Sequence, residues 1–230
     1  MTSRILAVDT TTEFGGLALL YGSEVVEELL LHSSEGFGHI LFANVERLLA
    51  KHAWAVLDID CFAAAAGPGT FTGTRVGLAA VKGFAEAAGK PVVAVSNLAA
   101  VASFGSAPLR AAVLDARRGE VYGAVYSGSL ELICPEIVTK FPAWLESLPA
   151  GDLEFLSPDF APFRHALAGT RFENAPVRQT PRSLAAAVGA IAVRRFIAGS
   201  FEDPATVDAN YVRHSDAELL WKDRQATENQ

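Results

Sequence analysis

The sequence is poor in cysteine, in charge and in long apolar runs. Its two cysteines, Cys61 and Cys134, can form at most one disulfide, which excludes a disulfide-stapled secreted domain and indicates a reducing compartment. Nowhere do about 20 apolar residues follow one another, as a membrane-spanning helix requires. The first apolar run, residues 5–8, ends at Asp9, which excludes a secretory signal there. We therefore expect a cytoplasmic protein without membrane contact.

Positive charge is also scarce, with 19 Lys and Arg against 26 Asp and Glu and a formal net charge of -7. Autonomous nucleic-acid binding depends on positive charge facing phosphates, so we expect any RNA contact to need a basic partner. The five histidines show no metal-ligand spacing, and no metal or cofactor is predicted. Apolar residues, in contrast, make up 50% of the 230 residues, which is enough to bury a substantial core.

The most informative stretch is residues 63–77. Its first residues form an uncharged apolar run that predicts a buried strand, which stops at the tight turn Gly67-Pro68-Gly69. A helix is predicted from there to Ala88, capped by Thr70 or Thr72. Gly67 and Gly69 are candidate phosphate-binding residues, because a helix N-terminus attracts anions. The same glycines could equally serve only to turn the chain.

This predicted helix is apolar around most of its circumference, since its charged residues fall within one narrow wedge. It therefore has enough apolar surface for its own sheet and for a second neighbour. We predict a partner interface on its face of small residues, Thr74, Gly77, Leu78, Val81 and Ala85. The predicted helix over residues 39–52 adds to this interface His39, Phe42, Ala43 and Glu46. The alternative is a helix packed on both sides inside its own domain.

One pattern occurs twice: a strand, an aspartate, a polar turn and a strand that contains glycine. It covers residues 5–21 and again residues 110–126, and Asp115 corresponds to Asp9. This repeat suggests an internal duplication. The turn-forming residues 105–108 between the copies form the best boundary in the chain. We expect an N-terminal lobe over residues 1–107 and a C-terminal lobe over residues 108–230, whose tail packs back on the first lobe.

Asp9 and the three threonines after it resemble the phosphate-and-metal hairpin of actin, sugar kinases and Hsp70. A carboxylate and hydroxyls at a strand end can hold Mg²⁺-bound phosphates, although an ordinary Asx or Thr turn has the same sequence. The second copy carries Arg117 and Arg118 with only one glycine, which disfavours a phosphate loop there. The candidate remnant of a nucleotide site is therefore Asp9, Thr10, Thr11, Thr12, Gly67 and Gly69.

Four segments, in the same order along nearly the full chain, resemble the TsaB family. They are Asp9-Thr10-Thr11-Thr12, residues 67–77, Asp115-Ala116-Arg117 with Gly119-Glu120-Val121-Tyr122, and Tyr211-Val212-Arg213. The resemblance implies an α/β, two-lobed actin-like ATPase (ASKHA) fold, each lobe a mixed sheet with flanking helices. It also implies a role in making threonylcarbamoyladenosine next to the tRNA anticodon. The implied partners are TsaD in a heterodimer, a second copy in its absence and a TsaE-type ATPase, with tRNA contacted only indirectly.

The enzyme TsaD resembles the chain through the same glycine-rich stretch, so the positions that differ are informative. Where TsaD has Val-Asn-His-x-x-x-His, with metal-binding histidines, this chain has Asn97 and Val101, and valine cannot bind a metal. The Ser-Gly-Gly-His loop of TsaD is replaced by residues 115–118. We therefore expect a subunit without catalytic residues that binds and activates TsaD. The alternatives are an autonomous actin-fold ATPase or kinase that uses Asp9, and a peptidase acting on TsaD.

Overall fold

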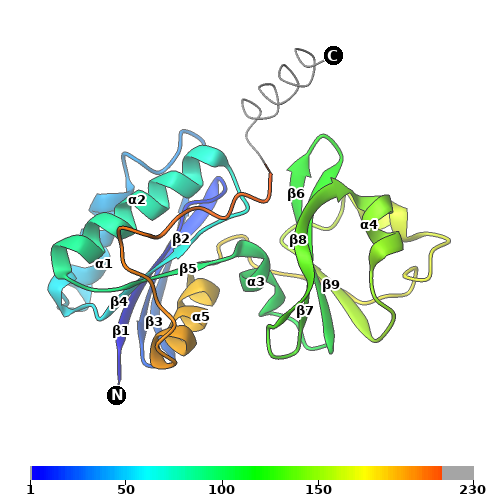
Figure 1. Cartoon of the computed structure of the whole chain (residues 1–230). Coiled ribbons are helices and arrows are strands. Elements are labelled where there is room, and N and C mark those ends of the chain that lie inside the picture. The colour runs from blue at the N-terminus through cyan, green and yellow to red at the C-terminus, as the bar shows by residue number, and fades with distance from the viewer. Residues whose placement is uncertain (1, 214–230) are drawn as a thin grey trace, which may run out of the picture.

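The computed structural model describes residues 2–213, which form two lobes side by side (Figure 1). The first lobe is built on a five-stranded mixed sheet of order β3-β2-β1-β4-β5. Its strands β1 to β3 are antiparallel, whereas β4 and β5 run parallel to β1. The strands are β1 (Arg4–Asp9), β2 (Phe14–Tyr21), β3 (Glu24–His32), β4 (Cys61–Ala65) and β5 (Val92–Val95).

The second sheet repeats this topology, with order β8-β7-β6-β9-β10 and the same alternation of antiparallel and parallel pairs. Its strands are β6 (Leu109–Arg117), β7 (Glu120–Ser127), β8 (Leu132–Lys140), β9 (Leu153–Ser157) and β10 (Val177–Gln179). The equal strand order agrees with the repeat in the sequence. The predicted fold class, two lobes that each carry a mixed sheet and flanking helices, is confirmed.

Helices cover both faces of the first sheet (Figure 1). Alternation along β1 sends Leu6 and Val8 into a core under α1 and α2, while Ile5 and Ala7 face a second core that contains α3 and α5. That second core also includes residues of the second sheet, which α3 contacts, while α5 packs on the first sheet and on α3. The helices are α1 (Leu41–Lys51), α2 (Phe71–Ala88), α3 (Asn97–Ala102), α4 (Phe141–Ser147) and α5 (Ala185–Ile197), with short 3₁₀ turns η1 (Val56–Asp58) and η2 (Arg164–Leu167).

Local sequence explains where α2 begins and ends. Thr70 is its N-cap, with the hydroxyl accepting the Gly73 N–H at 3.2 Å. Gly89, at φ +62°, ends the helix in the left-handed conformation that glycine adopts without strain. Across residues 2–213, none of the helices combines the length and apolar character needed to cross a bilayer.

Helix α5 follows the second sheet in the chain but packs against β1 and β2 of the first. The approach is close at Gly189, where a Cβ would lie 2.2 Å from Cδ1 of Leu20. Further along, the backbone N–H of Asn210 donates to the carbonyl of Ala66 at 2.8 Å, so the chain after α5 also lies on the first lobe. The division of the chain at residue 107 stays a prediction.

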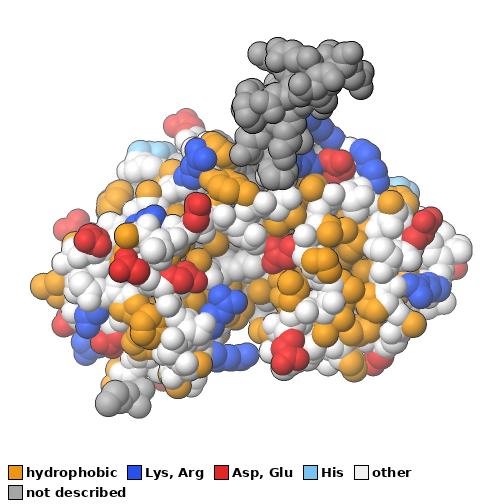
Figure 2. All heavy atoms as spheres, in the orientation of Figure 1, with side chains coloured by type: hydrophobic (Ala, Val, Ile, Leu, Met, Phe, Trp, Pro, Cys, Tyr) orange, Lys and Arg blue, Asp and Glu red, His pale blue; other side chains and the backbone are white. Residues whose placement is uncertain are grey.

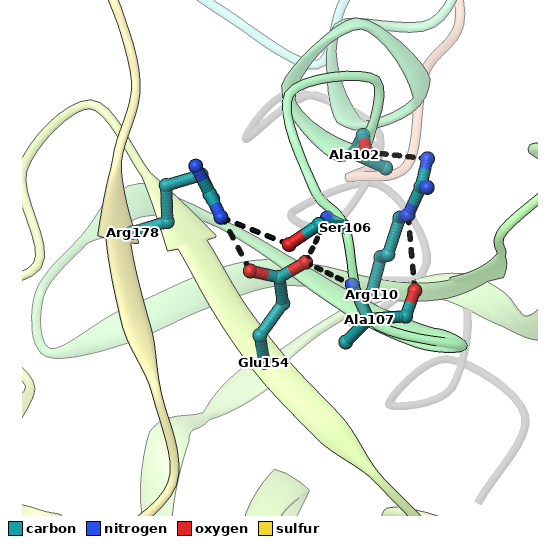
Figure 3. A network of polar contacts seen from close by, with 6 residues as sticks. All are labelled: Ala102, Ser106, Ala107, Arg110, Glu154 and Arg178. Carbon is teal, nitrogen blue, oxygen red and sulfur yellow. Dashed lines mark hydrogen bonds and ion pairs between the residues drawn. The ribbon is translucent and has the colours of Figure 1, made fainter.

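A buried carboxylate anchors the link between the lobes (Figure 3). Glu154 of β9 accepts hydrogen bonds from the backbone N–H groups of Ser106 and of Ala107, the latter at 2.6 Å, and from Nε of Arg178 at 3.2 Å. Burial by itself would raise the pKa of Glu154, but these hydrogen bonds outweigh it and hold the pKa below its ordinary value. The predicted boundary segment, residues 105–108, is thus tied to the second sheet.

Candidate functional site

The hairpin between β1 and β2 carries the candidate phosphate-binding residues, and its polar atoms bind other protein groups. The Asp9 Oδ1 atom accepts from the Thr11 N–H at 3.0 Å and from the Thr11 hydroxyl at 2.7 Å. The Oδ2 atom accepts from the Leu184 N–H, just before α5, at 2.9 Å. The Thr10 hydroxyl donates to the carbonyl of Gly73 at 2.7 Å. Asp9 thus ties its own hairpin to the start of α5.

Asp9 is 1% exposed, and burial raises the pKa of its carboxyl group against the lowering effect of the hydrogen bonds from Thr11 and Leu184. Thr12 is exposed, but its hydroxyl donates to the carbonyl of Phe14 within the same turn at 2.7 Å. Asp9, Thr10 and Thr11 are all buried. The arrangement is that of a structural Asx turn, the second of the two interpretations that the sequence left open.

The glycine-rich loop before α2 packs directly on this hairpin. A Cβ at Gly69 would lie 2.6 Å from the Cβ of Thr11, and one at Gly73 would lie 2.1 Å from the carbonyl oxygen of Thr10. The Thr70 N–H donates to the carbonyl of Thr11 at 2.7 Å. The space that the missing side chains leave at Gly69 and Gly73 is therefore filled by the hairpin.

Asn97 and Val101, which replace the TsaD histidines, are both buried. The Asn97 Oδ1 atom accepts from the Gly67 N–H at 3.0 Å, and its Nδ2 donates to the Thr11 hydroxyl at 2.6 Å, so this amide joins the loop to the hairpin. Val101 belongs to the core between the lobes. Within residues 2–213, no three His, Cys, Asp or Glu side chains come together as a metal site would require.

A carboxylate of the second lobe, which sequence reasoning missed, completes a network between the lobes. Glu136 of β8 accepts from the Tyr126 hydroxyl at 2.7 Å, from Nδ2 of Asn210 at 2.6 Å and from the Ser96 hydroxyl. Burial and the neighbouring Glu136 carboxylate raise the pKa of Tyr126. These contacts connect β7 and β8 with the start of α3 and with the C-terminal segment.

Three of the sequence motifs meet in this C-terminal segment, residues 207–213, which we call the interlobe clasp. Arg75 of α2 donates from Nε to the Tyr211 hydroxyl at 2.8 Å. The Arg213 guanidinium pairs with the carboxylate of Glu120 at the start of β7. The clasp thus runs from the first lobe to the second (Figure 1). The sequence motifs contain these oppositely charged and aromatic residues, but nothing in the sequence predicted which of them would pair.

The predicted interface on α2 needs a correction. Its residues Thr74, Gly77, Leu78, Val81 and Ala85 are the buried face of the helix. They face the sheet and the hairpin of their own lobe, as at Gly77, where a Cβ would lie 2.5 Å from the Thr10 hydroxyl oxygen. A partner cannot reach these side chains in the folded chain, so this part of the prediction is wrong. Small residues on this face allow close packing inside the lobe instead.

The predicted residues of the preceding segment and α1, in contrast, lie at the surface: His39, Phe42, Ala43 and Glu46 are exposed. Phe42 is 57% exposed, and its ring packs edge-on against Phe84 of α2 at 5.4 Å between centroids. The outward side of α2 is formed by Arg75, Ala79, Gly83, Glu86 and Ala87. We call the exposed residues of α1 and of the outward side of α2 the α1–α2 face.

Comparisons with known proteins agree with the resemblance. Residues 32–194 match the model of the family described as "TsaD: tRNA N6-adenosine threonylcarbamoyltransferase". The chain is 33% identical over 153 residues to the tRNA threonylcarbamoyladenosine biosynthesis protein TsaB of Bacillus subtilis, a match that covers 64% of this chain and 67% of that protein. It is 37% identical over 127 residues to the Escherichia coli protein of the same name, covering 54% of each. The chain thus spans between about half and two thirds of the length of these relatives.

The solved structure described as "YeaZ from Pseudomonas aeruginosa" is similar over a longer stretch. Its TM-score is 0.76 at 26% sequence identity, and the match covers 91% of this chain and 99% of that one. A second Pseudomonas aeruginosa structure, described as an uncharacterized protein with similarity to peptidase YEAZ, gives a TM-score of 0.72 at 25% identity. The similarity therefore includes both lobes.

Proposed function

The chain belongs to the TsaB family, and we propose that it is a non-catalytic subunit that binds and activates TsaD. Its relatives are named for tRNA threonylcarbamoyladenosine biosynthesis. In this proposal TsaD transfers the threonylcarbamoyl group to the adenosine next to the anticodon, in the cytoplasm. A TsaE-type ATPase joins the same complex, and this chain contacts tRNA only indirectly.

The observation that carries this proposal is that the polar groups of the β1–β2 hairpin are already hydrogen-bonded to other parts of the protein. An actin-fold ATPase or kinase needs a free carboxylate and an open glycine loop to hold a Mg²⁺-bound phosphate. Here the Asp9 carboxylate accepts three hydrogen bonds from protein donors, and Gly69 and Gly73 lie against Thr10 and Thr11. The same residues that would serve catalysis serve the packing of α2 and α5.

The partner surface that we propose is the α1–α2 face. It combines the exposed Phe42 ring with the small exposed residues Ala43, Ala79 and Gly83, which allow another helix to approach closely. Beside the Phe42 ring, apolar side chains line a shallow groove, among them Val45, Leu49, Trp54 and Phe84. In the absence of TsaD, the same face pairs with a second copy of the chain, because a two-fold dimer uses one patch twice.

The experiment that tests this proposal is a titration of the chain into a fixed amount of TsaD with its companion proteins, with threonylcarbamoylated tRNA as the readout. A subunit raises the modification rate until it is equimolar with TsaD, and further addition changes nothing. An enzyme that prepares or processes a component would restore the full rate in trace amounts. Full activity at trace amounts, or full activity of TsaD without the chain, would refute the proposal.

The rival function, an autonomous ATPase or kinase, is tested on the isolated chain. We expect no ATP hydrolysis with Mg-ATP. Turnover that disappears in Asp9→Asn, while that variant keeps its thermal unfolding midpoint, would favour the rival. The Asn side chain keeps the size of Asp9, but its NH2 group replaces one accepting oxygen and faces a donor, so the unfolding midpoint of the variant serves as the control for lost hydrogen bonds.

A further inference from the structure

A shallow groove lies at the C-terminal end of α2, where the chain that follows α5 crosses the edge of the first sheet. Its volume is about 430 Å³, and its walls come from the end of α2, the residues that lead into β5 and residues 201–204. The Val92 N–H donates to the carbonyl of Glu202 at 3.0 Å, and the Glu202 N–H donates to the carbonyl of Val92 at 2.8 Å. These two hydrogen bonds hold residues 201–204 against the edge strand β5, so the groove is part of the folded structure.

The charged side chains of this groove are mostly acidic. Glu86, Glu202 and Asp203 line it, and all three are exposed. The lining also includes Lys90, but its ammonium group lies 3.6 Å from the carboxylate of Asp60 and is thus already paired. Figure 2 shows Asp and Glu side chains gathered on the side of the first lobe where α2 ends. The groove therefore carries negative charge that its own basic residue does not balance.

The needs of folding do not explain the position of Glu86. It lies in the last turn of α2, where the helix dipole favours a basic residue and disfavours an acidic one. Within residues 2–213, its carboxylate makes no hydrogen bond and no ion pair, and the other two acids of the groove add repulsion. A residue that breaks a local rule without a gain for the fold points to a functional surface.

The groove also contains an exposed aromatic ring. Phe201 is 46% exposed, and its ring lies 5.7 Å from that of Phe196, between centroids. Such a ring attracts a guanidinium group placed over its face. The acids do not converge on one point, because the described part of the chain has no three acidic, His or Cys side chains placed to hold a metal ion. The groove therefore suits several cationic groups spaced along a chain better than a single metal ion.

We propose that this groove binds an extended, arginine-containing segment of a partner protein. A carboxylate accepts two parallel hydrogen bonds from a guanidinium group, and the three acids offer one such site each. Phe201 supplies the ring on which a further guanidinium group stacks. The net charge of -7 attracts the same basic segment from a distance. This surface goes beyond the proposed subunit role and does not rest on it.

The test uses the isolated full chain, a fluorescein-labelled peptide of four Arg-Gly repeats and anisotropy at low salt. In Glu86→Gln/Glu202→Gln/Asp203→Asn, we expect the affinity to fall about tenfold, as for three lost surface ion pairs. In Phe201→Leu, which keeps an apolar side chain but removes the ring, we expect a fall of about threefold. A peptide with Lys in place of Arg should respond less to Phe201→Leu, because the guanidinium group stacks on aromatic faces more readily.

A stability measurement accompanies the binding assay. Glu86→Gln alone removes the unfavourable charge from the last turn of α2, so its thermal midpoint should rise by about 1 to 3 °C. The proposal thus predicts weaker peptide binding together with higher stability. A lower midpoint would show that the Glu86 carboxylate serves the fold, and it would overturn the proposal.

The matched control, Glu24→Gln/Glu35→Gln/Glu146→Gln, removes the same charge from exposed positions away from the groove, and it should bind the peptide like the unchanged chain. No peptide binding by the unchanged chain, or equal losses in both triple variants, would each overturn the proposal. Displacement of the peptide by equimolar spermidine or Mg²⁺ would also overturn it, because the groove would then be a site for small cations. The assay contains no TsaD, so its failure is separate from failure of the subunit proposal.

Discussion

The proposed α1–α2 face makes a quantitative prediction for Phe42→Ala. A phenylalanine side chain has an accessible area of about 200 Å². With Phe42 57% exposed, about 110 Å² remains for a partner to cover, which at about 25 cal/mol per Å² corresponds to about 3 kcal/mol. If Phe42 is fully buried in the complex, the dissociation constant for TsaD should rise about 100-fold. Loss of the edge contact with Phe84 should lower the free energy of unfolding by only about 1 kcal/mol.

The measurement is titration calorimetry of the purified chain with TsaD, together with urea denaturation of each variant. The matched control is Ile197→Ala, which removes an apolar side chain that is 69% exposed at the end of α5, away from the α1–α2 face. The control should bind TsaD like the unchanged chain. A change of less than about threefold for Phe42→Ala, or an equal loss for Ile197→Ala, would show that this face is not the interface.

Four further predictions follow from the buried polar groups and the clasp. Glu154→Gln should lower the free energy of unfolding, measured in urea, by about 3 kcal/mol. Arg178→Met should lower it by only about 1 kcal/mol or less, because the Arg178 side chain is 47% exposed. Because the pKa of Glu154 is lowered in the folded state, the stability that its carboxylate contributes is complete above the ordinary pKa of 4.5 and is lost as the pH falls through the lowered pKa. The difference in free energy of unfolding between the unchanged chain and Glu154→Gln should therefore shrink from pH 7 to pH 3. Burial raises the pKa of the Cys61 thiol to about 12, so native protein treated with iodoacetamide should be modified at Cys134 first, as read by mass spectrometry. Arg213→Met should increase hydrogen exchange in residues 207–213 without lowering the global free energy of unfolding by more than about 1 kcal/mol.

Much of the fold could be predicted because the patterns that specify it are local. The apolar run at β4, the Gly-Pro-Gly turn and the threonine cap of α2 all lie within residues 61–74, and the structure has each where the sequence predicts it. The repeated hairpin suggested an internal duplication, and the two sheets do have the same strand order. The short strand β10 was not predicted, since three residues, two of them exposed, show no alternation to recognise.

The candidate site was harder to predict, because helical periodicity does not say which of two apolar sides faces the sheet. On α2 the small residues around Gly77 and Val81 lie inward, and the outward side carries Ala79 and Gly83. A helical wheel contains both stripes, and only the position of the β1–β2 hairpin distinguishes them. The contacts of Glu136 join four chain segments, and no local pattern encodes such a pairing.

The return of α5 to the first sheet has a consequence for biosynthesis on the ribosome. The face of the first sheet that α5 covers is complete once β5 has emerged, yet α5 follows only about 100 residues later, which corresponds to about 5 to 20 s of translation. During that interval Ile5, Ala7 and Leu20 lack the helix that buries them. The nascent N-terminal half is therefore a natural client for chaperones, and a chain truncated after β5 should aggregate when expressed alone.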